Sequence, residues 1–86
     1  MKNLPEWLIN LGVILRELRL NKGFSSAEAF AFSYELNRSI SQKWETGSNM
    51  ELKSLSRLCE IHNMRASEIL KLAEEKGKKE KEMALQ

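Results

Sequence analysis

The sequence predicts an all-α fold, a compact single domain of five helices, and three observations lead to this prediction. The 86 residues contain only one Pro and four Gly, which is few breakers for an all-β chain. Apolar residues recur at steps of three and four, the spacing of one face of an α-helix. Residues that favour helix ends stand between the periodic segments.

The first helix is expected from about Pro5 to Lys22. Pro suits the first turn, where its missing N–H is not needed, and Gly23 suits a left-handed position just past the end. A second helix, capped by Ser25 or Ser26, should continue to about Ser33 with Phe30 and Ala31 buried. The apolar stripe of the first helix consists of Leu8, Leu11, Ile14, Leu15 and Leu18.

A third, short helix is predicted from Arg38 to about Thr46, with Asn37 as its N-cap and Gly47 after its end. The connection from the second helix is then only three or four residues long. Trp44 is expected to anchor this helix in the core. The remaining side chains of "NRSISQKWE" are mostly polar, so the helix is either an ordinary solvated one or has a face that contacts a partner.

The fourth helix is expected from Met50 to about His62, capped by the pair "SN" at 48–49, with Asn63 as a left-handed exit. A fifth is expected from about Arg65 to Lys76. The domain would therefore span residues 1–76, and the charged segment 77–86 would be a frayed helix end or a disordered tail. The expected buried positions are Leu52, Leu55, Leu58 and Cys59, then Ile69, Leu70 and Ala73.

Composition restricts the class of protein. The formal net charge is only +2, so a nucleic-acid-binding surface would have to be a local one. The single Cys59 excludes an internal disulfide and fits a reducing compartment. Pro5, Glu6 and Asn10 interrupt the apolar N-terminus, and no segment has the length of a membrane span. We therefore expect a soluble cytoplasmic protein with no membrane partner.

The residues indicate neither an enzyme nor a cofactor. No Ser/His/Asp set, glycine-rich phosphate loop or pair of catalytic carboxylates can be assembled from the sequence. Cys59 and His62 are spaced i,i+3 on one helix, but a zinc site needs three or four ligands and no further Cys or His exists. We expect both side chains to pack rather than to bind a metal.

The pieces "LRELR…KG", Ala31, "WETG" and "LKSLSRLCEIHNM", in this order and spacing, resemble the phage-repressor (Cro/repressor-like, XRE-type) helix-turn-helix family. The resemblance covers about residues 11–70. It implies a lambda-repressor-like domain with the helix-turn-helix at the second and third helices, and a dimeric regulator whose third helix enters the major groove. It also implies that Glu45 pairs with Arg19 in the first helix.

The chain departs from the family at two positions and leaves the register of the third helix open. Ala27 stands where the family often has a phosphate-binding Gln, and Glu35 stands where the turn usually has Gly. The family's spacing from Ala31 to Trp44 places Ser41 inward, and we prefer this register because it keeps the turn length. In the alternative register Ile40 is the inward residue.

Arg38 faces outward in both registers. At the start of the helix its guanidinium could pair with guanine in the major groove, and Lys43 could reach a base or a phosphate. With Ser41 inward, the outward set is Arg38, Ser39 and Lys43. With Ile40 inward, it shifts toward Asn37, Arg38 and Gln42. Asn37, Ser39 and the helix start also suit a phosphate. The predicted DNA-binding residues are Arg38, Ser39, Lys43, Gln42, Asn37, Ser26 and Asn49.

Two functions follow from this reading. The first is a sequence-specific transcriptional regulator, a repressor acting on double-stranded DNA as a homodimer, with apolar residues of the fifth helix or of "LPEW" at the dimer surface. The second is an antitoxin or adaptor that uses the same fold to bind a protein partner, which the low net charge, Ala27 and Glu35 favour.

Overall fold

The computed structural model describes residues 4–47 and 49–84, and every regular element within these ranges is an α-helix. The expected all-α class with five helices is therefore confirmed. The helices are α1 (Glu6–Asn21), α2 (Ala27–Ser33), α3 (Arg38–Glu45), α4 (Leu52–His62) and α5 (Ala66–Ala84).

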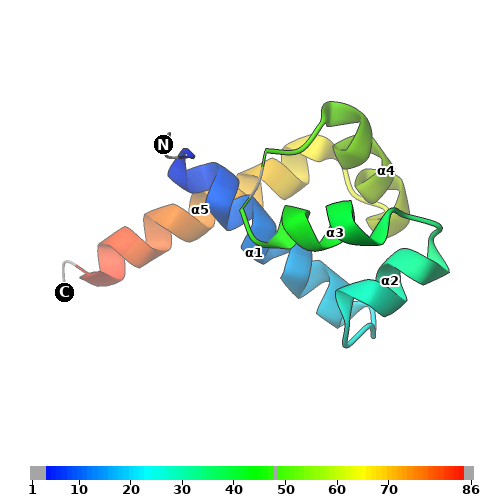
Figure 1. The fold of residues 1–86 in the computed structure, drawn as a ribbon. Coiled ribbons are helices and arrows are strands. Elements are labelled where there is room, and N and C mark those ends of the chain that lie inside the picture. The colour runs from blue at the N-terminus through cyan, green and yellow to red at the C-terminus, as the bar shows by residue number, and fades with distance from the viewer. Residues whose placement is uncertain (1–3, 48, 85–86) are drawn as a thin grey trace.

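The first helix organises the domain. α1 contacts α2, α3 and α5, while α4 packs on α5. Figure 1 shows α3 crossing α1, with α2 and α4 to either side of α3, and the C-terminal part of α5 extending beyond the other helices. This arrangement puts α3 at the surface of the domain with only one side against the core.

The core contains the apolar stripes that the periodicity predicts. Ile69 and Ala73 of α5 are completely buried, and Leu18 and Leu70 are partly buried against the same cluster. The cluster of buried apolar residues consists of Leu8, Leu11, Ile14, Leu15, Phe30, Trp44, Leu55, Leu58, Ile61, Ile69 and Ala73.

Most helix ends follow the predicted local chemistry. Of the two candidate serines, Ser26 is the N-cap of α2, and its Oγ accepts the Ala29 N–H at 3.1 Å. Gly23 follows α1 with a φ of +100°, and Asn63 ends α4 in the left-handed conformation with a φ of 53°. Left-handed exits of this kind let the following N–H groups bond the last helical carbonyls.

The start of α4 differs from the prediction. The helix begins at Leu52, not Met50, and its N-cap Glu51 makes no side-chain capping hydrogen bond. Asn49 is exposed in the connection before it, and Ser48 lies outside the described residues. Leu52 is the first helical residue, and it is 81% exposed rather than buried as expected.

The fifth helix does not end at Lys76 but continues through the charged segment to Ala84. Glu, Lys and Ala are good helix formers, so the composition of 77–84 favours a helix by intrinsic propensity. The domain boundary at residue 76 is therefore not a helix end, and the division there stays a prediction. In the part of the chain that the structure describes, no helix combines the length and the apolar character needed to cross a bilayer.

Aromatic rings cover the junction of α2 with α4. Phe24 and Tyr34 both pack edge-on or tilted against Phe30, with ring centroids 5.5 and 5.1 Å away. His62 of α4 stacks on Phe30 as well. The two rings are nearly parallel, with their centroids 5.6 Å apart. Burial, helped by the charge of Lys22, lowers the pKa of His62. The predicted packing role of His62 is thus what its contacts show.

Candidate functional site

α3 is a helix of eight residues with a well-defined beginning. The side-chain oxygen of Asn37 accepts the Ile40 N–H at 3.1 Å, and its backbone carbonyl accepts the Ser41 N–H at 2.9 Å. An isolated helix of this length would be marginal in water, so the cap and the tertiary contacts must hold it. The predicted N-cap is confirmed.

The connection between α2 and α3 is short and ordered by backbone hydrogen bonds. Glu35 adopts a left-handed φ of 55°, although a glycine would do so with less strain. The next N–H, that of Leu36, then bonds the Ala31 carbonyl at 2.8 Å, and the Leu36 side chain packs on the core. These contacts determine how α3 leaves α2.

The inner side of α3 rests on α1. Ser41 is 2% exposed and Trp44 is 8% exposed, whereas Ile40 is 46% exposed. The structure therefore has the preferred register, with Ser41 inward. Gly12 of α1 brings the two helices close together, because a Cβ at this position would lie 2.7 Å from the carbonyl oxygen of Trp44.

A buried ion pair joins the end of α3 to α1. Arg19 donates from Nε and Nη2 to the two carboxylate oxygens of Glu45 at 2.9 and 3.0 Å, and from Nη1 to the Phe24 carbonyl at 2.8 Å. Only 7% and 12% of the two charged side chains are exposed. The pairing that the family resemblance implies is thus present, and it holds the orientation of α3.

The outer side of α3 carries five of the predicted residues. Arg38 is the first residue of the helix, and its Nη2 lies 3.6 Å from Oε2 of Glu28 on α2, with both side chains about two-thirds exposed (66% and 60%). Such an exposed pair contributes little stability and can exchange partners. The exposed predicted residues on α3 and at its cap are Asn37, Arg38, Ser39, Gln42 and Lys43.

The other two predicted residues lie outside α3. Ser26 is exposed at the start of α2, but its Oγ already accepts a backbone N–H. Asn49 is exposed in the connection from α3 to α4. Whether either of them belongs to the same binding surface stays a prediction.

A shallow hollow of about 380 Å³ lies beside α3, where α1 and α2 approach it. Gln42 and Glu45 line it from α3, and Arg16 and Arg19 line it from α1. Arg16 is exposed and was not among the predicted residues. It precedes Arg19 by three positions, so the predicted contact of Arg19 with α3 could have indicated that Arg16 lies near the same helix.

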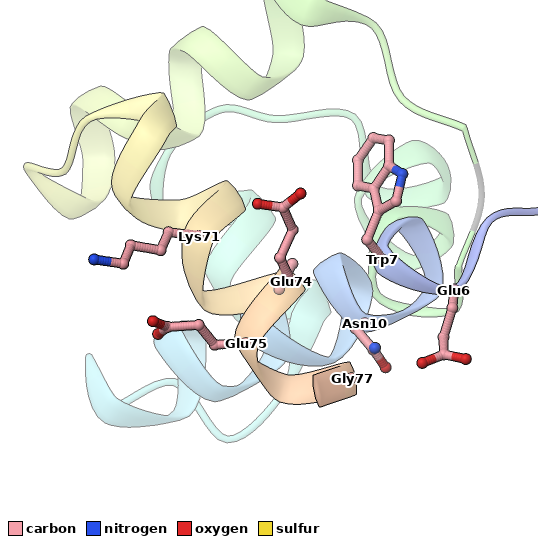
Figure 2. Close-up of a pocket in the computed structure, with 8 residues that line it drawn as sticks. Glu6, Trp7, Asn10, Lys71, Glu74, Glu75 and Gly77 are labelled. Atoms are coloured by element: carbon pink, nitrogen blue, oxygen red, sulfur yellow. The ribbon is translucent and has the colours of Figure 1, made fainter. Parts of the chain in front are cut away.

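A larger hollow of about 520 Å³ lies between the beginning of α1 and α5. Figure 2 shows that its charged side chains do not converge: Lys71 and Glu75 point away to one side and Glu6 to the other, while Glu74 points toward Trp7. No group of three or more potential metal ligands occurs in the described part of the chain. We therefore place the candidate site on the outer side of α3, not here.

Comparison with known proteins adds no relative. The chain matches no protein-family model, no curated protein and no solved structure. The resemblance to phage repressors therefore stays a prediction from the residues.

Proposed function

We propose that this protein is a sequence-specific DNA-binding transcriptional regulator, a cytoplasmic repressor of the phage-repressor type. In this proposal α2 and α3 form a helix-turn-helix, and α3 enters the major groove. The observation that carries it is the construction of α3. Trp44 and the Arg19–Glu45 pair hold its inner side on α1, while its outer side presents exposed polar residues on a capped first turn.

The chemistry of the first turn supports base recognition. Arg38 is the first residue of α3 and is exposed, so its planar guanidinium can reach O6 and N7 of a guanine. The 3.6 Å contact between Arg38 and Glu28 is on the surface. Arg38 can therefore leave Glu28 and bind a guanine at little cost in free energy. Gln42 can pair with adenine, and Lys43 with a base or a phosphate.

Contacts to the DNA backbone would set the position of α3 in the groove. Asn37, Ser39, Ser26 and Asn49 are all exposed, and side chains of these types commonly contact phosphates. A homodimer would place two copies of α3 in successive major grooves about 34 Å apart. The low net charge of +2 implies that affinity depends on these local contacts more than on overall attraction.

Selection of bound duplexes from a random pool tests the proposal, followed by titration of the selected site at several salt concentrations. Each phosphate neutralised should steepen the log–log slope by about 0.9. Arg38→Ala should lose about 1–3 kcal/mol of discrimination at one guanine. The matched control is Arg65→Ala, which removes an exposed arginine from the α4–α5 connection and should leave the preference unchanged.

A random pool that yields no preferred sequence, with binding equally weak for every duplex, would refute the proposal. Loss of discrimination in both arginine variants alike would also count against it, because the effect would then come from total charge rather than from the position of Arg38.

One observation favours the second candidate, an antitoxin or adaptor that binds a protein. Phe32 on α2 and Leu52 on α4 are 82% and 81% exposed, and exposed apolar side chains are common anchors in protein interfaces. Under this alternative, Phe32→Ala or Leu52→Ala should abolish partner binding. Arg38→Ala combined with Lys43→Ala should abolish DNA binding only.

A further inference from the structure

The outer side of α3 contains one residue that base pairing and phosphate contacts do not explain. Ile40 is 46% exposed, and among the eight residues of α3 it is the only apolar side chain that is not buried. A β-branched residue is also less favourable than Ala in an exposed helix. About half of this apolar side chain is therefore open to solvent on the outer side of α3.

The helix geometry places Ile40 at one edge of the exposed surface and Arg38 at the other. Successive residues are about 100° apart around the axis, so Ile40 lies about 60° from Lys43, and Arg38 lies on the far side of Ser39. Both Arg38 and Ile40 belong to the first turn of α3, the part of the helix that would lie closest to the base edges.

The major groove offers one apolar group, the C5-methyl of thymine. We propose that Ile40 contacts this methyl group within the same site that Arg38 reads, so that the preferred site combines a guanine with a thymine at a separate base pair. This inference rests on the proposed function. It adds Ile40 as a specificity determinant beside the polar residues on the outer side of α3.

Deoxyuridine provides an atomic test, because it keeps the Watson–Crick and hydrogen-bonding edges of thymine and lacks only the methyl group. Each thymine of the selected site is replaced in turn, and affinities of the wild type and of Ile40→Ala are measured by fluorescence anisotropy. At one thymine the wild type should lose about fourfold in affinity, the value of one buried methyl group. Ile40→Ala should lose nothing further at that thymine.

Two variants serve as controls. Leu20→Ala removes a side chain of similar size and exposure (45%) from α1, and it should retain the full sensitivity to deoxyuridine. Ile40→Val keeps both branches at Cβ and should retain most of the sensitivity. Thermal unfolding of each variant verifies that the fold is unchanged, as expected for half-exposed positions.

The possible outcomes distinguish a failure of the proposed function from a failure of the inference about Ile40. A wild type that selects no sequence overturns the proposed function and this inference with it. A wild type that selects a site but tolerates deoxyuridine everywhere, or loses the same affinity as Ile40→Ala at every thymine, overturns the inference alone. An effect of Leu20→Ala equal to that of Ile40→Ala would do the same.

Discussion

The two mid-helix glycines Gly12 and Gly77 should respond in opposite directions to the same substitution by alanine. Intrinsic helix propensity favours Ala over Gly by about 1 kcal/mol in both helices. At Gly12 the new Cβ would meet two backbone oxygens, those of Trp44 at 2.7 Å and Glu45 at 2.9 Å. Backbone cannot move aside without displacing α3, so we expect a strain of about 3 kcal/mol, the upper end for overpacking.

The expected net effect of Gly12→Ala is thus a loss of about 2 kcal/mol in the free energy of unfolding. For a domain of this size it corresponds to a fall of roughly 8–16 °C in Tm. At Gly77 the Cβ would meet only Oε1 of Glu6 at 2.8 Å and Nδ2 of Asn10 at 2.9 Å. These are the far ends of side chains that can rotate, so Gly77→Ala should raise the stability by up to about 1 kcal/mol.

Urea and thermal unfolding followed by far-ultraviolet circular dichroism measure both changes against the wild type. Gly77→Ala acts as the control for helix propensity, because it makes the same chemical change away from α3. A Gly12→Ala variant as stable as the wild type would show that α1 and α3 are not in backbone contact at this point, and the account of how α3 is held would then be wrong.

Three further predictions concern charged groups. Glu45→Gln should lower the free energy of unfolding, measured in urea, by on the order of 3 kcal/mol, because it leaves the guanidinium of Arg19 without its counter-charge and Arg19 is only 5% exposed. Arg19→Met combined with Glu45→Leu should recover most of this loss. Burial lowers the pKa of His62, so the unfolded chain binds more protons as the pH falls below about 6.5, and stability should fall there by at most about 1.4 kcal/mol per pH unit. His62→Gln should lack that part of the pH dependence. Glu28→Gln should strengthen binding to every duplex by up to about fivefold, since it removes a carboxylate 3.6 Å from Arg38; weaker binding would instead indicate that Glu28 orients the arginine.

Local sequence chemistry was sufficient to predict the helices and several of their ends. Asn37 and Ser26 cap through hydrogen bonds to backbone groups three residues away, and left-handed exits such as Asn63 need only their own backbone dihedrals. The apolar periodicity likewise determined which sides of the helices face inward. These features span one or two helical turns. The groups that determine them are therefore close together in the sequence.

The candidate site was predicted in part, because its inward residues obey the same periodicity. Ser41 and Trp44 lie inward in the preferred register, and Arg19 meets Glu45 as the family resemblance implies. The contact of Arg38 with Glu28 and the position of Arg16 at the same hollow as Gln42 could not be predicted. Both depend on where two helices approach each other, and a short sequence pattern does not determine the distance between two helices.

The sequence by itself thus determined five amphipathic helices and a short, capped, polar one among them. The tertiary structure alone decided that Gly12 lets α1 touch the backbone of α3, and that Leu52 is exposed rather than buried. The physical reason is that burial of an apolar side chain requires a partner surface at the right distance. Periodicity predicts only which side of its helix a residue lies on, whereas the packing of the neighbouring helices decides whether that side is covered.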